Sequence, residues 1–239
     1  MTVKDVDDQL TPGMPPKQGL YDPQFEHDSC GVGFVVDIKG RKSHRIVTQA
    51  LTVLKNLLHR GACGCEANTG DGAGVLIQMP HAYLRRVCST IGIALPELRW
   101  YGAGLVFLPT DPVQAARCQI ILEQIVRDEG QIVLGWRNVP TNDAPIGQSA
   151  RAVEPVIKQI FIGRNADLAD DRAFERRLYV IRKRAEHAIY GSDMPARKFF
   201  YVPSLSSNTL IYKGMLSADQ IETMYPDVTD PAVESALAL

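Results

Sequence analysis

The sequence predicts an α+β fold in which sheets are covered by helices. Short apolar runs rich in Val, Ile and Phe recur along the chain and indicate buried strands. Longer amphipathic segments separate only some of these runs, so strands and helices alternate in part. Hydrophobic residues make up 45% of the 239 residues and charged residues 22%, which is typical of a globular protein with a sizeable core. A pure helix bundle or a pure barrel fits this pattern less well.

The first residues predict a flexible leader. Residues 1–24 contain four of the 15 prolines and no periodic apolar pattern. The run CGVGFVVDI, residues 30–38, is apolar and β-branched, and Gly40 follows it. We therefore expect a leader or propeptide over residues 1–29 and one domain over residues 30–239, which begins with a buried strand that ends in a turn.

The remaining elements follow from periodicity and from turn residues. Apolar spacing predicts helices over residues 45–58, 81–90, 112–128 and 170–190, and a short helix over 217–225 that Ser217 would cap. Apolar runs predict strands over residues 75–79, 102–108, 131–139, 156–163, 198–205 and 209–216, and the start of another over 236–239. A glycine-rich loop over residues 60–74 joins the first helix to the next strand. Glycine permits positive φ and lets a backbone approach a ligand closely.

The bulk composition narrows the class of partner. Its 26 basic and 27 acidic residues give a net charge of -1, so we expect neither nucleic acid nor a membrane surface as a partner. No apolar run approaches the roughly 20 residues that cross a bilayer, and the acidic, Pro/Gly-rich N-terminus is no secretory signal. The five cysteines are an odd number in a long chain, which predicts reduced thiols in a cytoplasmic protein.

Cys30 is the candidate nucleophile because it stands where the leader meets a strand. Cleavage between Ser29 and Cys30 would place a thiol and a free α-amine on one residue. An α-amino group has a pKa of about 7.7–8.0, so it can act as the general base near neutral pH without a histidine. Read from the residues alone, the alternative is a buried structural cysteine that acts as a small hydrophobic side chain.

Two other motifs have weaker readings. The glycines of NTGDGAG, residues 68–74, weakly resemble a phosphate-binding loop. The segment lacks the Gly-Lys-Ser/Thr ending of such a loop, and Asp71 would repel a phosphate. A plain turn between helix and strand is the structural alternative. Cys63, Cys65 and His59 lack the fourth ligand and the spacing of a zinc site. We expect no metal here.

Three blocks carry a resemblance to a known family. They are GLYDPQFEHDSCGVGFV, HRGACGCEANTGDGAGVLIQMPH, and SLSSNTLIYKGML followed by MYPD. In order and spacing they resemble the start of glutamate synthase large subunits, whose N-terminal domain is a class II glutamine amidotransferase. The resemblance implies the N-terminal-nucleophile hydrolase fold, a four-layer α/β/β/α sandwich.

The resemblance also implies roles for particular residues. Cys30, freed by removal of the leader, would attack the side-chain amide of glutamine and form a γ-glutamyl thioester, which releases ammonia and is then hydrolysed. Arg60 would lie beside this nucleophile and organise it, although a cation at a helix C-terminus is an equally good structural explanation. The residues that match the segment near the family's glutamine pocket are Asn68, Thr69, Gly70, Asp71 and Gly72.

Parts of the family pattern are missing from the sequence. The family's Arg-Tyr/Phe-Ser-Thr motif holds the glutamine α-carboxylate, and its His-Asn-Gly motif forms the oxyanion hole; neither occurs here. We therefore expect an incomplete sandwich that shows little glutaminase activity alone. No cofactor is expected in this segment; FMN and an iron–sulfur cluster would belong to the absent synthase part. Implied partners are glutamine, the remainder of the synthase chain, and a small electron-donor subunit or ferredoxin.

Two other functions remain open at this point. The chain could be an inactive fragment or a non-catalytic module that binds glutamine or a partner, which would need no cleavage at Cys30. It could also be a different N-terminal-nucleophile hydrolase, such as an amidase. The conjunction of the three blocks favours the glutaminase of a glutamate synthase, which would supply ammonia for glutamate formation from 2-oxoglutarate.

Overall fold

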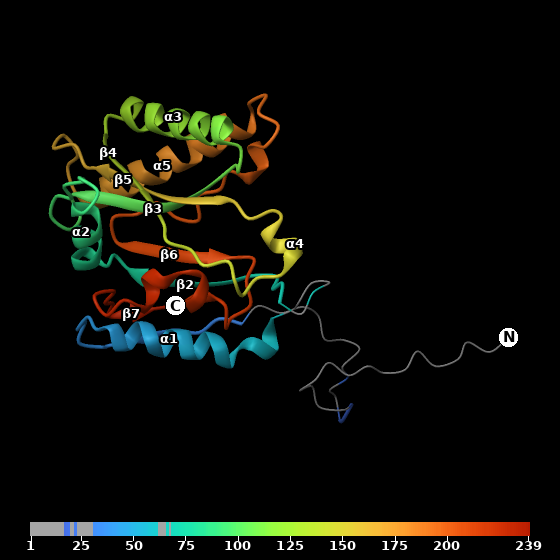
Figure 1. Cartoon of the computed structure of the whole chain (residues 1–239). Helices are drawn as coiled ribbons and strands as arrows, with labels where there is room; N and C mark the ends of the chain where they lie inside the picture. Colours follow the sequence, from blue (N-terminus) through green and yellow to red (C-terminus); the bar gives the residue numbers. More distant parts are fainter. Residues whose placement is uncertain (1–16, 20–21, 23–30, 62–65, 67) are drawn as a thin grey trace.

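Two antiparallel sheets pack face to face between helices in the computed structural model, which describes residues 17–19, 22, 31–61, 66 and 68–239 (Figure 1). The four-stranded sheet has the order β1 (Val35–Val36), β7 (Leu237–Ala238), β2 (Ala73–Gln78) and β6 (Thr209–Gly214). The three-stranded sheet has the order β3 (Tyr101–Leu108), β5 (Val156–Gly163) and β4 (Ile132–Asn138). Every strand pair is antiparallel, and a register shift lies between Val133 and Gly135 in β4.

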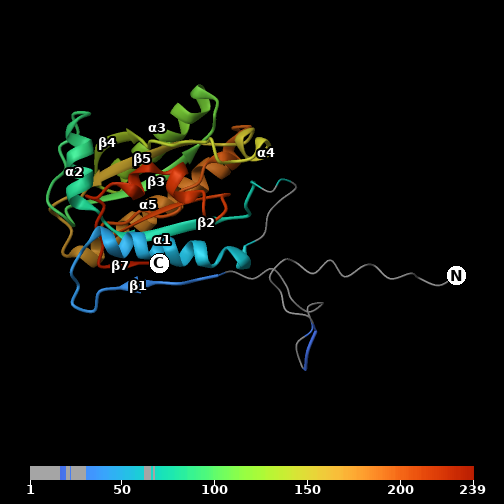
Figure 2. The same cartoon turned by 60° about the horizontal axis from the view of Figure 1, so that its bottom comes forward.

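Helices cover the outer faces of both sheets. Helices α3 (Pro112–Asp128) and α5 (Asp171–Tyr190) lie over the three-stranded sheet, and α1 (His44–Asn56) lies under the other (Figure 1). Turned by 60°, Figure 2 shows β1 and β7 running along α1. The α/β/β/α layering implied by the resemblance is confirmed. The shorter elements are α2 (His81–Ser89), η2 (Leu58–Arg60), α4 (Gln148–Arg151), η3 (Arg197–Phe199), α6 (Ile221–Met224) and η4 (Pro226–Thr229).

The long helices begin where their sequence signals stand. Asp111 caps α3 by accepting the Gln114 backbone N–H at 2.8 Å, and Pro112 occupies the first turn. Asp170 caps α5 in the same way, with Ala173 N–H at 2.7 Å. The predicted helices over 112–128 and 170–190 are therefore confirmed, with Asp170 as the cap of the second.

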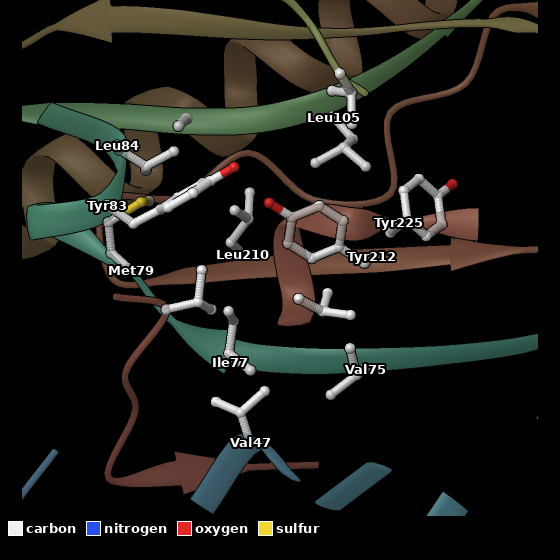
Figure 3. Close-up of a cluster of buried hydrophobic side chains, with 14 of the residues drawn as sticks. Val47, Val75, Ile77, Met79, Tyr83, Leu84, Leu105, Leu210, Tyr212 and Tyr225 are labelled. Carbon is white, nitrogen blue, oxygen red and sulfur yellow. The ribbon is translucent and has the colours of Figure 1, made fainter. Parts of the chain in front are cut away.

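Alternating residues of β3 serve two hydrophobic cores. Tyr101, Ala103 and Leu105 face the other sheet, whereas Val106 and Leu108 pack against α3 and α5. In Figure 3, Leu210 and Tyr212 of β6 lie between the sheets under Leu105, while Val75 and Ile77 of β2 lie nearer Val47 of α1. All of these side chains are buried.

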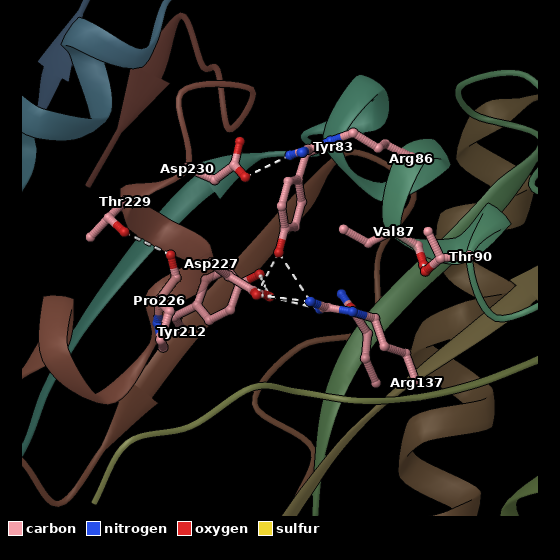
Figure 4. A network of polar contacts seen from close by, with 11 residues as sticks. Tyr83, Arg86, Val87, Thr90, Arg137, Tyr212, Pro226, Asp227, Thr229 and Asp230 are labelled. Atoms are coloured by element: carbon pink, nitrogen blue, oxygen red, sulfur yellow. Dashed lines mark hydrogen bonds and ion pairs between the residues drawn. The ribbon is translucent and has the colours of Figure 1, made fainter. Parts of the chain in front are cut away.

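A buried ion pair between Arg137 of β4 and Asp227 of η4 links the two halves of the molecule (Figure 4). The contact is bidentate, with Nη1–Oδ2 and Nη2–Oδ1 distances of 2.7 and 2.8 Å. Tyr83 and Tyr212 each donate a hydroxyl to the same carboxylate, at 2.5 and 2.9 Å. Burial, together with Asp227, raises the pKa of both tyrosines, so both remain donors. Gln159 completes the group by accepting from Arg137 at 3.2 Å.

The predicted strand over residues 198–205 is wrong. The 3-10 turn η3 occupies its start, and only single bridges, Tyr201 to Phe107 and Ser206 to Ala103, link the following segment to β3. Pro203 lies between the two bridges and has no N–H to donate, so a continuous ladder cannot form.

The predicted buried strand over residues 30–38 is correct in type but wrong in length and burial. Of the described residues 31–38, only Val35 and Val36 form strand β1, which pairs with β7, and Gly40 makes the expected turn with φ 70°. Its Val35 side packs on the core near α1, whereas the side chains at 32, 34, 36 and 38 are 71%, 66%, 44% and 97% exposed. One face of β1 is therefore covered and the other is open.

The predicted cap of the 217–225 helix is also wrong. Helix α6 begins only at Ile221, and the hydroxyl of Ser217 bonds the carboxylate of Asp219 instead. The side chain of Gln220 accepts the Ser217 N–H at 2.9 Å, so residues 217–220 form a turn. No helix in the described part of the chain has the length and apolarity to cross a bilayer.

We predict that Asp227→Asn lowers the free energy of unfolding by about 3–5 kcal/mol, because it leaves the buried Arg137 guanidinium without a counter-charge. The measurement is urea denaturation. Asp230→Asn is the matched control, because Asp230 pairs with the half-exposed Arg86 and should cost less than about 1 kcal/mol. Equal losses in both variants would contradict a special role for the buried pair.

Candidate active site

Arg60 follows α1 and lies against Gly31, the first residue of the described range 31–61. Gly31, which follows Cys30 in the chain, packs on this helix end: a Cβ at Gly31 would lie 3.2 Å from the Cβ atoms of both Arg60 and Leu57. Gly33 packs on the same helix one turn earlier, where a Cβ would lie 2.5 Å from Cγ1 of Val53. Two glycines thus let the strand segment lie directly on the helix, and Arg60 stands at that junction.

Arg60 itself is exposed, on the 3-10 turn that continues α1. Its backbone N–H donates to the carbonyl of Leu57 at 2.8 Å, so the residue lies at the C-terminal end of the helix. A cation in this position also offsets the helix dipole. The two roles foreseen for Arg60, beside the nucleophile and at a helix end, are compatible with its position.

The glycine-rich loop is held by two segments that are distant in sequence. The carbonyl of Asn68 accepts the N–H of Gly147 at 3.1 Å and Nε2 of Gln220 at 2.8 Å. Gly70 is buried against the backbone of Leu216 and Ser217, where a Cβ would lie 2.3 Å from the Leu216 carbonyl carbon and the Ser217 nitrogen. Only glycine fits there without displacing the backbone.

The rest of the loop is more open. Asp71 is exposed, and Gly72 adopts a φ of 151°, which side-chain-bearing residues rarely take. Thr69 donates its hydroxyl to the carboxylate of Glu66 at 2.9 Å. The end of α1, the start of β2 and α4 lie at the same end of the molecule (Figure 1), so Arg60 and this loop share one end of the sandwich.

Glu66 is a residue of this region that sequence reasoning missed. Its carboxylate accepts the Thr69 hydroxyl and, from α4, the N–H and hydroxyl of Ser149 at 3.2 and 3.0 Å. The Thr69 hydroxyl and the Ser149 groups hold the pKa of Glu66 below its usual value, so it is ionised at neutral pH. The acidic residue stands inside the recognised block, but nothing in the sequence indicates that Ser149 would meet it.

The two cysteines in the described residues have unreactive thiols. Cys88 and Cys118 are free and buried, and burial raises the pKa of each to about 11. Neither is a candidate nucleophile. Cys30, Cys63 and Cys65 lie outside the described residues, so their roles stay predictions. Within the described residues, no three His, Cys, Asp or Glu side chains are grouped to hold a metal ion.

Comparison with known proteins decides the family. The model for the class-II glutamine amidotransferases matches residues 30–239. The chain belongs to this family. Its two antiparallel sheets between helices are accordingly an N-terminal-nucleophile hydrolase fold. This is the family and fold that the three sequence blocks indicated.

Several glutamate synthases are similar to this class-II amidotransferase chain. The large chain of the NADPH glutamate synthase of Bacillus subtilis (strain 168) is 45% identical over 228 residues, which cover 95% of this chain and 14% of that protein. The corresponding large chain of Azospirillum brasilense is 39% identical over 220 residues, covering 92% and 14%. The NADH glutamate synthase of Saccharomyces cerevisiae is 38% identical over 238 residues, covering 95% and 11%. The chain therefore spans 11–14% of the length of these relatives.

We predict that Gly70→Ala lowers the stability of the chain by about 1–3 kcal/mol, because the new Cβ overpacks against the backbone of residues 216–217. Thermal unfolding measures the change. Gly61→Ala is the control from the same block: Gly61 has a φ of -93° and a Cβ there would meet only the Leu58 carbonyl, at 3.5 Å. Its stability should stay within about 0.5 kcal/mol of the parent. A Gly70→Ala variant as stable as Gly61→Ala would show that the loop does not pack as described.

Proposed function

We propose that this chain is the glutamine-hydrolysing segment of a glutamate synthase large chain. The observation that carries the proposal is the family match, which begins at the candidate nucleophile Cys30 and covers residues 30–239. The packing of Gly31 on Arg60 supports it, because the residue next to the proposed nucleophile lies against the Cβ of the arginine that the family places beside the nucleophile.

In the proposed reaction, removal of residues 1–29 gives Cys30 a free α-amine. The amine, directly or through a water, takes the thiol proton while sulfur attacks the side-chain amide carbon of glutamine. The C–N bond then breaks, the proton passes to the departing nitrogen, and ammonia leaves a γ-glutamyl thioester. Water attacks the thioester and releases glutamate and the thiol. The sum is glutamine and water to glutamate and ammonia.

The chain's own residues have three tasks in this scheme. Cys30 supplies the nucleophile and the base. Arg60, a fixed positive charge at the end of α1, favours the thiolate and the developing negative charge. The loop Asn68–Gly72 forms one wall of the glutamine pocket, where its glycines let backbone groups come close to the substrate.

Other tasks fall to the rest of a large chain. Groups that hold the glutamine α-carboxylate and the oxyanion would come from the two motifs that this sequence lacks. FMN and an iron–sulfur cluster would lie in the synthase part, which would combine the ammonia with 2-oxoglutarate. The names of the relatives carry NADPH, NADH or ferredoxin, so a small electron-donor subunit or ferredoxin is the expected partner. A cytoplasmic location suits the free thiols Cys88 and Cys118.

We predict that Cys30→Ala in the intact large chain abolishes glutamine hydrolysis, by roughly three or more orders of magnitude, because it removes the covalent nucleophile. Glutamate released from glutamine is measured, and ammonia-dependent synthesis should persist because that chemistry is separate. Cys118→Ala is the control, since this thiol is buried in α3 with a raised pKa. Near-normal glutamine use by Cys30→Ala, with loss in Cys63→Ala, would overturn the assignment.

We also predict that the active large chain starts at Cys30 and needs its amine unprotonated. Intact mass should lack residues 1–29, and kcat/KM for glutamine should rise with pH and level off above a pKa near 7.7–8.0, because only the neutral amine accepts a proton. An active preparation that retains Met1–Ser29 would refute the amine as base. A kcat/KM that is flat between pH 6 and 9 would do the same.

A further inference from the structure

Gln220 is buried at the point where three loops meet. Gln220 directly precedes α6 and is 4% exposed. Nε2 donates to the carbonyl of Asn68 at 2.8 Å and to that of Pro145 at 2.9 Å, and Oε1 accepts the N–H of Ser217. Both N–H donors and the oxygen are thus used. A buried amide that is fully bonded to three backbone segments fixes their relative positions.

The segment before α4 also holds this loop. Gly147 donates its N–H to the carbonyl of Asn68, which Gln220 also bonds. A Cβ at Gly147 would fall 2.1 Å from Oε2 of Glu66 and 2.2 Å from Oγ1 of Thr69. Gly147 has φ -68° and ψ 164°, a conformation open to any residue, so a Cβ at this position would disturb the side chains of the loop rather than the backbone of Gly147.

The loop cannot supply this rigidity alone. Glycine loses more conformational freedom on ordering than any other residue, and fixing one backbone residue costs roughly 1–2 kcal/mol of entropy. A binding loop must nevertheless be held to about 0.5 Å to be effective. Contacts from outside the loop are therefore needed, and residues 145–149 and 217–220 provide them.

We propose that Gln220 and Gly147, with the Glu66–Ser149 contact, form a clamp that sets the conformation of the Asn68–Gly72 loop and so determines the affinity for glutamine. The substrate part rests on the proposed function, which places this loop at the glutamine pocket. The clamp residues are positioning residues. They act through the loop and take no part in bond making.

The first test measures the clamp without any activity. In the 239-residue chain, hydrogen–deuterium exchange of the amides over residues 68–72 is compared in the parent, Gln220→Leu and Gly147→Ala. Exchange should rise about tenfold, as expected when one or two hydrogen bonds are lost. Gln124→Leu is the control, because Gln124 is exposed and bonds Asp128 within α3. It should leave loop exchange unchanged.

The Gly147→Ala variant distinguishes release of the loop from a general loss of stability. The atoms that its Cβ would meet are the far ends of the Glu66, Thr69 and Asn68 side chains. These can swing away, so the midpoint of thermal unfolding should stay within a few degrees of the parent while the loop is released. Faster loop exchange with an unchanged midpoint therefore separates loop positioning from global stability.

The second test uses the intact large chain and glutamine. Gln220→Leu and Gly147→Ala should raise KM about tenfold and leave kcat within about threefold, because a positioning contact remote from the reacting atoms changes binding of ground and transition states alike. Ser149→Ala should raise KM, whereas Ser149→Thr, which keeps the hydroxyl donor to Glu66, should restore it. Gln124→Leu should match the parent.

The outcomes separate the clamp from the proposed function. Unchanged loop exchange in both clamp variants overturns the clamp, even if the parent hydrolyses glutamine. Faster exchange with an unchanged KM, or a fall in kcat alone, overturns the link to glutamine affinity and leaves the Cys30 mechanism intact. A parent large chain that does not hydrolyse glutamine refutes the proposed function and the glutamine role of the clamp, while exchange still decides whether the clamp holds the loop.

Discussion

The bidentate pair between Arg137 and Asp227 is the contact on which the arrangement of this molecule depends. Two buried charges are tolerable only when their remaining hydrogen-bonding groups are satisfied. Tyr83 and Tyr212 complete the carboxylate, and Gln159 accepts from the guanidinium. The group thereby joins α2, η4 and strands of both sheets, which hydrophobic packing alone would hold together with less geometric precision.

The Arg137–Asp227 network also helps to position Gln220, which lies in the same segment of the chain as Asp227. Asp227 lies in η4, which follows α6 almost directly, and Gln220 stands at the start of α6. The Met224 N–H bonds the Gln220 carbonyl at 2.8 Å, and the Asn142 N–H bonds the Met224 carbonyl at 3.1 Å. A charged anchor between the sheets therefore fixes the base from which Gln220 reaches the glycine-rich loop. Hydrogen bonds and the short α6–η4 segment therefore connect the buried ion pair between the sheets to the candidate site.

Helix α1 performs a second positioning task. Its buried face, with Val47 and Leu51, packs on the four-stranded sheet, and its last turns carry the strand segment at Gly31 and Gly33. Arg60 comes directly after it. Hydrophobic packing of the helix therefore helps to decide where this cation lies. That is why Arg60 can be exposed and still stand in a defined place.

Local rules were sufficient for the long elements and for the family. The helix over 112–128 and the strand over 156–163 match their predicted bounds because periodicity and flanking Asp, Pro and Gly residues act over short distances. The three blocks likewise identified the class-II amidotransferase family, because motif residues can be recognised from the sequence without a structure. They also directed attention to Arg60 and to the loop of residues 68–72.

What only the tertiary structure decided were contacts between residues far apart in sequence. The bonds of Glu66 to Ser149, and of Gln220 to Asn68 and Pro145, join segments whose meeting depends on how both sheets pack. The open face of β1 and the broken pairing around Pro203 have the same origin, since burial and ladder formation depend on neighbours supplied by the fold. The sequence alone determined the long helices, most of the strands and the family, and it indicated the candidate nucleophile. The tertiary structure decided which distant side chains hold the candidate site in place, because hydrogen bonds act only between groups that the fold brings within about 3 Å.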